Sequence, residues 1–403
     1  MNSLKRIFPL LTVLFLGYLG FSLALPLFPP LFLDPSLQFL PPSVTPEMRR
    51  IWLGILFAMY PIGQFIGAPL LGKWSDKYGR KPIILISLII VIPAYLGSAC
   101  AILYTLPGLL FVSRFFSGLL EGNIVIAQAA IADISEDAKT KTKNFGWLVS
   151  LSSTAFFFGP LIGGKLADSK IVSWFHYDTP FWCAAILSLI GFLVVALLFR
   201  ETHAPDREIE ISFKTLIKTF SEGLKYRRLR VIFTTNFCFF LAIFFFLNFF
   251  SAYLVSAFQF TFSLLGEVNA YLSLPIILAP LVFGFFTKLW STKKTTQIGS
   301  FLLSVSYVLF VIPASPWALL LTLLPVGFFM AMGFAFPALL VSDAVSKRFQ
   351  GQALGTNQSI QVFAEAFTAL IGGFFMALSN TLPIYLGALC GLLGTLALMK
   401  QKD

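Results

Sequence analysis

Charged residues are scarce in this sequence of 403 residues: they make up 12% of it, against about 25% in soluble domains. Histidine occurs only twice, at His176 and His203, and the four cysteines are too far apart to form a metal-ligand or redox motif. These shortages exclude an ordinary soluble enzyme and a disulfide-stabilised scaffold, and we expect no metal or other cofactor. The chain is instead 57% apolar and contains 47 Phe, which is typical of a polytopic membrane protein.

Twelve apolar segments are each long enough to cross a bilayer, which takes about 20 residues. Charge, Pro or Gly marks the breaks between them. The expected spans are 7–33, 50–71, 83–104, 107–131, 145–167, 179–199, 230–257, 264–287, 296–313, 316–340, 352–378 and 382–399. The sequence therefore predicts an all-α membrane protein with twelve transmembrane helices.

The basic residues orient these spans. With a cytoplasmic N-terminus, 24 of the 29 Lys and Arg residues fall on the cytoplasmic side, four lie in outer loops, and Arg114 lies inside a span. Such a bias is the positive-inside rule, so it explains the net charge of +11 without a nucleic-acid partner. We expect both termini to be cytoplasmic and the lipid bilayer to be the surrounding medium.

The spans fall into two sets of six. Residues 1–200 and 230–403 are expected to form the N- and C-terminal six-helix bundles, joined by a basic cytoplasmic linker at 201–229. Apolar residues recur in this linker at helical spacing and favour an amphipathic helix on the inner leaflet, with a plain solvated linker as the alternative. These residues are Phe213, Leu216, Ile217, Phe220 and Leu224.

The two halves resemble each other weakly. Ile-Gly-Gly occurs at residues 162–164 and again at residues 371–373, and Asp133 and Asp343 each follow an equivalent span. At a nearly constant offset, these matches predict a duplicated unit and two pseudo-symmetric bundles, which is typical of secondary transporters.

The loop after the second span reads Gly72-Lys-Trp-Ser-Asp76-Lys-Tyr-Gly79-Arg80-Lys-Pro. It resembles the signature of the major facilitator superfamily between its second and third helices. Gly79 suits a tight turn, and Arg80 can pair with a carboxylate. The resemblance implies a conformational latch made of Gly72, Asp76, Gly79, Arg80 and Asp133, in which Arg80 meets Asp133 and Asp76 meets the start of the eleventh span.

The fourth span carries charge into the membrane. Arg114, Glu121 and Gln128 are seven residues apart and would share one face of a continuous helix. The surrounding Arg-x-x-x-Gly-x-x-x-Gly pattern resembles the second motif of the family, and the spacing to Asp133 is similar to that of its tetracycline-exporter branch. Since intramembrane charges are costly, we expect them to line a wet cavity and serve function, with a structural Arg114–Glu121 pair as the alternative.

The fifth span contains Gly159, Pro160, Gly163 and Gly164. This stretch resembles the antiporter motif of the family, although Ala155 replaces an upstream glycine. Gly and Pro would kink the helix and allow close helix packing. Generic packing by small residues is the alternative interpretation.

The eleventh span carries Gln358, Gln361 and Glu365 along one stripe. A proton-coupled carrier needs a carboxylic acid that gains and loses a proton inside the membrane, and Glu121 and Glu365 are the candidates. A neutral acid at a helix interface is the alternative for Glu365.

These observations predict a secondary active transporter, not an enzyme, that works as a monomer by alternating access. By resemblance to the drug:proton antiporter branch, it would export small amphipathic or anionic organic molecules in exchange for protons, across a bacterial inner membrane. The alternatives are an uptake carrier or facilitator for a metabolite or siderophore and, less favoured, a polytopic membrane enzyme or a scaffold without transport activity.

Overall fold

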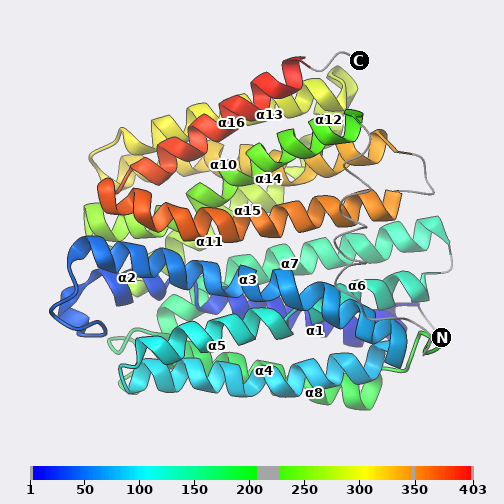
Figure 1. Cartoon of the computed structure of the whole chain (residues 1–403), viewed down its shortest axis with the longest axis horizontal. Helices are drawn as coiled ribbons and strands as arrows, with labels where there is room; N and C mark the ends of the chain where they lie inside the picture. Colours follow the sequence, from blue (N-terminus) through cyan, green and yellow to red (C-terminus); the bar gives the residue numbers. More distant parts are fainter. Residues whose placement is uncertain (1–2, 136, 207–226, 346–349, 401–403) are drawn as a thin grey trace. The chain divides into compact units, whose positions relative to one another are not determined.

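The computed structural model describes the chain except for residues 1–2, 136, 207–226, 346–349 and 401–403 (Figure 1). The described residues form helices joined by short loops and contain no strand. The amphipathic helix expected between Phe213 and Leu224 lies outside the described residues. An all-helical membrane fold is thus what the composition predicted.

The successive helices are joined by short connections within each of the two parts of the chain that flank residues 199–226. In the first part of the chain they are α1 (Ser3–Leu23), α2 (Phe28–Leu33), α3 (Pro46–Tyr78), α4 (Arg80–Leu103), α5 (Pro107–Leu120), α6 (Asn123–Ile134), α7 (Ala138–Leu166) and α8 (Thr179–Leu198). In the second part they are α10 (Arg227–Phe258), α11 (Phe262–Leu278), α12 (Pro280–Leu289), α13 (Thr292–Val311), α14 (Pro316–Asp343), α15 (Gln350–Leu378) and α16 (Leu382–Lys400).

Local sequence explains where many of these helices begin. Proline stands at the first helical position of α3, α5, α12 and α14, where no backbone donor is needed. Asp137 caps α7 by accepting a bond from the Thr140 amide at 2.8 Å, and Ser291 caps α13 in the same way. The starts of α3, α5, α13 and α14 fall within four residues of the expected spans, whereas α7 begins seven residues earlier than expected and α12 begins inside the expected span 264–287.

Eleven stretches of the described residues are long and apolar enough to cross a membrane. Helix α13, which corresponds to the expected span 296–313, is not among them. Its first turns carry Thr, Lys and Gln, which lower its mean hydropathy. The number of twelve spans and the orientation of the termini therefore remain predictions.

Three expected spans are interrupted. Residues 7–33 form α1 and the short α2, and residues 264–287 form α11 and α12, which begins at Pro280. The fourth span is broken between Leu120 and Asn123 into α5 and α6. The expectation of one continuous helix from Arg114 to Gln128 was therefore wrong at this point, because Glu121 and Gly122 form a turn.

By their internal contacts, the residues divide into two compact units. Unit 1 comprises residues 1–44, 59–211 and 261–270, and unit 2 comprises residues 45–58, 212–260 and 271–403. Helices α3 and α11 each contribute to both units. The expected domain boundaries at 200 and 230 remain a prediction. The sequence did not predict that the first part of α3 belongs to unit 2 or that the first part of α11 belongs to unit 1.

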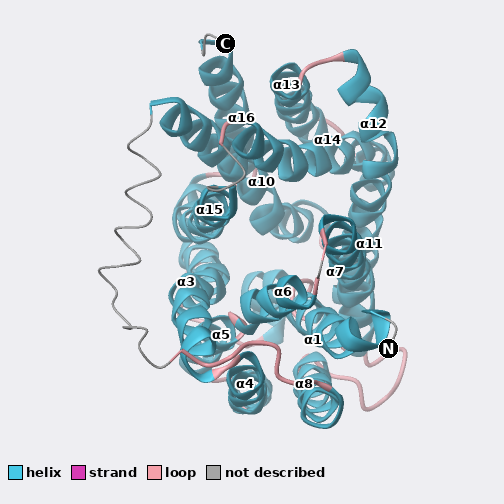
Figure 2. Cartoon of the chain, turned by 90° about the vertical axis from the view of Figure 1, so that its right-hand side faces the viewer, coloured by secondary structure: helices cyan, strands magenta, loops and turns pink. Residues whose placement is uncertain are grey.

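The same packing pattern occurs inside each unit. In unit 1, α1 packs against α7 and α8, and α4 packs against α5 and α8. In unit 2, α10 packs against α15 and α16, and α13 packs against α14 and α16. Figure 2 shows α4 beside α8 in unit 1. The sequential order of the helices makes α1 equivalent to α10, α4 to α13, α5 to α14, α7 to α15 and α8 to α16.

Candidate functional site

Arg114 and Glu121 lie deep inside unit 1. Arg114 is on α5 and is 2% exposed, and Glu121 follows the last residue of α5 and is 3% exposed. Two ionisable side chains buried within a membrane span require specific partners, because an unpaired charge there is costly. The partners of these two residues differ.

Glu121 is held by two tyrosines. The hydroxyl of Tyr60 on α3 donates a hydrogen bond to carboxylate Oε2, and the hydroxyl of Tyr95 on α4 donates one to Oε1. Both tyrosines are almost fully buried. These two tyrosines were not identified from the sequence. A buried tyrosine hydroxyl normally requires a polar partner, and an acid in a neighbouring span can provide it.

Glycines bring these helices together. Gly63 on α3 and Gly118 on α5 lie where an added Cβ would collide with the backbone of the opposite helix, at Phe115 and at Tyr60 respectively. One turn further on, Gly122 would place a Cβ 2.7 Å from Ala68 Cα. Small residues four apart on both helices permit this close approach. The glycines of the second family motif therefore position Tyr60 against Glu121.

Arg114 is surrounded by aromatic rings. Its guanidinium carbon lies 5.0 Å from the ring centre of Tyr60, 5.3 Å from that of Phe28 and 5.7 Å from that of Phe21. Its Nη1 atom is buried and has no hydrogen-bond partner in the part of the chain that the structure describes. No carboxylate there is within ion-pair distance, so an Arg114–Glu121 salt bridge is absent from this structure.

The other predicted polar residues of the membrane are more accessible. Gln128 on α6 is half-buried. On α15 in unit 2, Gln358 is exposed, and Gln361 and Glu365 are half-buried. The Asn248 side chain on α10 contacts the Glu365 carbonyl at 3.5 Å. Their roles in substrate binding and proton coupling remain predictions.

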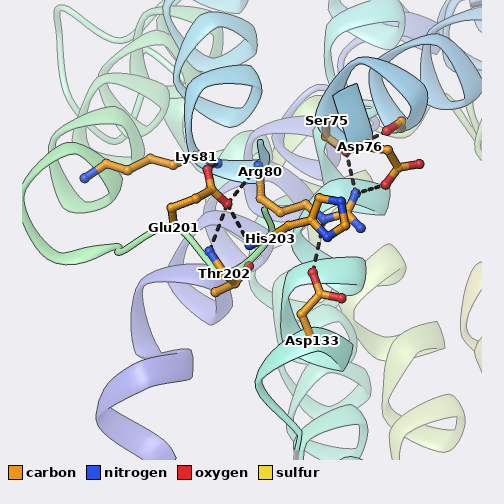
Figure 3. A network of polar contacts seen from close by, with 9 residues as sticks. Ser75, Asp76, Arg80, Lys81, Asp133, Glu201, Thr202 and His203 are labelled. Atoms are coloured by element: carbon orange, nitrogen blue, oxygen red, sulfur yellow. Dashed lines mark hydrogen bonds and ion pairs between the residues drawn. The ribbon is translucent and has the colours of Figure 1, made fainter. Parts of the chain in front are cut away.

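The loop between α3 and α4 is organised by Arg80 (Figure 3). Its Nη1 donates to Ser75 Oγ at 2.7 Å and to Asp76 Oδ1 at 2.5 Å, and its Nε donates to Asp133 Oδ2 at 3.2 Å. Asp133 lies at the end of α6, so the guanidinium ties this loop to a second helix. The structure thus brings Asp76, Arg80 and Asp133 together. The expected meeting of Asp76 with the start of the eleventh span involves unit 2 and remains a prediction.

Glu201 adds a partner to this loop that the sequence analysis did not identify. Its carboxylate accepts the backbone N–H groups of Arg80 at 3.0 Å and Lys81 at 2.9 Å, and also those of Thr202 and His203 (Figure 3). Partial burial opposes ionisation of this carboxyl, but the four donors outweigh it and lower its pKa. An acid just after the sixth span, on the same side as Arg80, was the available signal.

The glycines of the loop differ in their surroundings. Gly79 precedes the first residue of α4 with a φ of 101°, a conformation that favours glycine, and an added Cβ would lie 2.6 Å from Glu201 Oε2. Gly72 has open space around its Cα. Close approach therefore explains Gly79 but not Gly72, for which the structure provides no packing reason.

The glycines of the predicted antiporter motif face two directions. An added Cβ on Gly159 or Gly163 would collide with Ser22 or Leu23 at the end of α1, whereas one on Gly164 would collide with the Phe262 carbonyl oxygen. Pro160 lies inside α7, where it removes one helical hydrogen bond.

The second Ile-Gly-Gly segment packs in the same way inside unit 2. An added Cβ on Gly372 would collide with the ring of Phe249 on α10, and one on Gly373 would lie 3.0 Å from Gly54 Cα. Because α10 is the equivalent of α1, the repeated tripeptide performs the same packing task in both units.

Nothing in the described part of the chain resembles a metal site, since no group of three His, Cys, Asp or Glu side chains is close enough to hold an ion. The polar chemistry of unit 1 is therefore that of a buried carboxylate, a caged guanidinium and an ion-pair network.

Comparison with known proteins gives a consistent picture. Residues 10–279 and 232–402 match the model of the Major Facilitator Superfamily. The tetracycline resistance protein, class H, of Pasteurella multocida is 28% identical over 384 residues, which cover 93% of this chain and 88% of that protein. The class B protein of Escherichia coli is 34% identical over 202 residues, so the match spans 50% of this chain and about half (45%) of that relative.

The fold has been seen in solved structures. The crystal structure of the nucleoside transporter NupG has a TM-score of 0.73 at 16% identity, covering 100% of this chain and 100% of that one. At this identity the likeness shows the fold alone.

Proposed function

We propose, from the premise that this chain belongs to the Major Facilitator Superfamily, that it exports small organic molecules in exchange for protons. The chain is a multi-pass membrane transporter with relatives named for tetracycline resistance, and those names favour a small organic substrate. The buried carboxylate of Glu121 between two tyrosine hydroxyls supports proton coupling.

The hydrogen bonds of Glu121 supply a mechanism for coupling. An ionised carboxylate accepts from Tyr60 and Tyr95 at the same time. A protonated carboxyl carries its own O–H donor and is a weaker acceptor than a carboxylate, so protonation weakens or reverses the hydrogen bond from one tyrosine. Because Tyr60 is on α3 and Tyr95 is on α4, each proton transferred changes how α5 is tied to a neighbouring helix.

The position of Glu121 adds to this effect. It sits at the break between α5 and α6, where the backbone is not fixed by a continuous helical hydrogen-bond ladder. At the other end of α6, Asp133 is bound by Arg80. Helix α6 therefore connects the carboxylate that takes up the proton to the latch, and a shift at one end is transmitted along a short rigid element. Alternating access needs such a link between ion binding and loop contacts.

Proteoliposomes that contain a pH-sensitive dye test the proposal. When a pH gradient is imposed, the wild-type protein is expected to carry protons across the vesicle membrane, down the gradient, once tetracycline or another organic substrate is added. Replacing Glu121 by Gln keeps the size of the side chain but removes the titratable group, and this flux should fall to background. Substrate-driven proton flux that persists unchanged in this variant would refute the role of Glu121.

The control is Glu267→Gln, because Glu267 is an exposed acid of α11 with no predicted role. It should transport like the wild type. Comparing the direction of substrate flux with that of proton flux distinguishes export from uptake, since an antiporter moves substrate against the proton flux and a symporter moves it with the flux.

A further inference from the structure

The guanidinium of Arg114 is buried, is attracted by the nearby charge of Glu121 without a salt bridge to it, and has one donor, Nη1, with no hydrogen-bond partner among the described residues. We propose that Arg114 is the recognition point for the acidic group of an organic anion, so that the substrate carries a carboxylate or phenolate on an aromatic or planar apolar body. The proposal rests on the transport function above and specifies its substrate class.

One N–H donor group of Arg114 has no partner among the described residues. A buried polar group without a partner destabilises a protein by about 1–3 kcal/mol, so such groups are rare and call for an explanation. Nη1 of Arg114 is such a donor within the described residues, and the side chain is 2% exposed. A guanidinium presents its N–H groups in a planar fork that matches two acidic oxygens. A ligand carboxylate would satisfy the atom that the protein leaves without a partner.

Aromatic rings hold the guanidinium of Arg114 in place. Three aromatic faces lie within 6 Å of the guanidinium carbon, from Phe21, Phe28 and Tyr60. A desolvated cation–π contact contributes about 2 kcal/mol or more and involves the ring faces, not the N–H donors. A salt bridge would have consumed the donors. The aromatic cage therefore holds the guanidinium and leaves Nη1 without a partner among the described residues.

The hydrogen bonds of Glu121 disfavour a cationic substrate. Glu121 is the one acid that the structure places near this region, and each of its carboxylate oxygens already accepts a tyrosine hydroxyl. A cationic substrate would have to share oxygens that two tyrosines already use. An anion meets an unsatisfied donor instead, so the local hydrogen bonding favours anions over cations.

The apolar part of the substrate also has a surface nearby. Phe21 and Phe156 are half-buried and lie edge to face with ring centres 6.1 Å apart, and the half-buried Tyr18 lies 5.8 Å from Phe156. Such rings offer faces and edges on which a planar substrate body can pack. Arg114 is thus next to an aromatic surface that is only partly covered, which is the combination that an aromatic acid requires.

Three probes of one shape test the charge preference: 2-naphthoate, 2-naphthamide and 2-naphthylmethylammonium. Their dissociation constants are measured on the full-length protein in nanodiscs at pH 7.5. We expect the wild type to bind naphthoate at least ten-fold more tightly than the amide, with the ammonium weakest. Equal binding of acid and amide, or no binding of any of the three probes, would overturn the assignment.

Variants place the preference on Arg114. Arg114→Gln should lose the preference for naphthoate over naphthamide, and Arg114→Lys should retain part of it. Arg230→Gln is the matched control, because Arg230 is an exposed arginine of α10, and it should keep the full ratio. A ratio retained in Arg114→Gln would refute the proposal. If Arg114→Gln fails to fold, Arg114→Lys decides alone. A single ammonium cannot form the two-pronged contact, so it should lower the ratio clearly below that of the wild type without abolishing it, whereas an unreduced ratio refutes the proposal.

This result is independent of the test of proton coupling. If acid and amide bind equally while Glu121→Gln still abolishes proton flux, the substrate class is wrong and the antiport proposal stands. If naphthoate is preferred and Glu121→Gln transports normally, the anion site stands and the coupling role fails.

Discussion

Tyr95 and Tyr307 lie on equivalent helices of the two units, α4 and α13, yet they do different things. Both are almost completely buried. Tyr95 donates its hydroxyl to Glu121, whereas the Tyr307 hydroxyl has no partner among the described residues, and its ring stacks on Phe246 with centres 4.7 Å apart. Helix α14, the equivalent of α5, has no acidic residue before Asp343 at its end. Across these equivalent helices, the duplicated fold has therefore kept its packing, whereas the acid that meets the tyrosine is found only beside α4.

The two loops at the matching ends of these helices differ in the same way. Ser75 is followed by Asp76 and, further on, by Arg80, which together build the ion-pair network. In unit 2, Ser291 is followed by Thr292 and Thr296, and the hydroxyl of Thr296 donates only to the Thr292 carbonyl within the same helix. The two units therefore share packing positions, whereas the ion-pair network of Arg80 is not repeated at Thr296.

The largest effects are expected where the units are alike. Gly164→Leu and Gly373→Leu would each force a side chain against the backbone of a neighbouring helix. Overpacking of this kind is expected to destabilise each variant by about 3 kcal/mol and to abolish transport. Thermal unfolding and proteoliposome flux measure the two effects.

Gly146→Ala and Gly355→Ala are the matched controls in the two units, since nothing lies within 4 Å of an added Cβ at either site. Because alanine is the better helix former, these variants should be unchanged or slightly more stable, by up to about 1 kcal/mol. If Gly373→Leu were tolerated while Gly164→Leu was not, the two Ile-Gly-Gly segments would not be equivalent.

The next effect separates the two loops. Arg80→Gln removes the side-chain bonds to Ser75, Asp76 and Asp133, and each bond to a charged group contributes about 1.5–3 kcal/mol when it is well shielded from water. We expect at least a ten-fold loss of transport and a clearly lower Tm. Thr296→Val, at a position five residues after Ser291 just as Arg80 is five residues after Ser75, should change either quantity little. Similar losses in both variants would show that the second loop also acts as a latch.

The tyrosine pair gives a smaller effect of opposite sign. Tyr95→Phe leaves one oxygen of Glu121 without its donor and is expected to lower stability by about 1–3 kcal/mol. Tyr307→Phe removes a buried hydroxyl that has no partner among the described residues, so it should be neutral or stabilise the protein by about 1 kcal/mol. Chemical unfolding of both variants decides, and equal destabilisation would break the comparison.

The sequence predicted the elements of this structure better than their interruptions. Hydropathy and Pro or Gly breaks identify nearly every helix because about 20 apolar residues are a strong signal. The break at Glu121 and Gly122 was missed, since Gly122 is explained by Ala68 on another helix. The interruption depends on a contact distant in sequence, which hydropathy does not contain.

For the candidate site, the sequence identified the charged residues but not their partners. Arg114 and Glu121 stand out as charges in an apolar span, and Arg80 belongs to a recognisable motif. Tyr60 and Tyr95 do not stand out, because tyrosine is common in membrane proteins and its partner is set by helix packing. For the same reason, the spacing of seven residues between Arg114 and Glu121 did not reveal that the two side chains have separate partners.

The smallest effect concerns Glu201, for which unit 2 has no described counterpart. Its folded-state pKa is lowered, so its contribution to stability is complete above the ordinary pKa of about 4.3 and is lost as the pH falls through the folded-state value. Glu201→Gln should therefore lower Tm modestly at pH 7, because the group is exposed and its interactions are screened. The difference from wild type should shrink as the pH falls below the ordinary pKa of glutamate, because the carboxylate is progressively protonated. A difference that does not change with pH would mean that the shape of the side chain, and not its charge, holds the start of α4 in place.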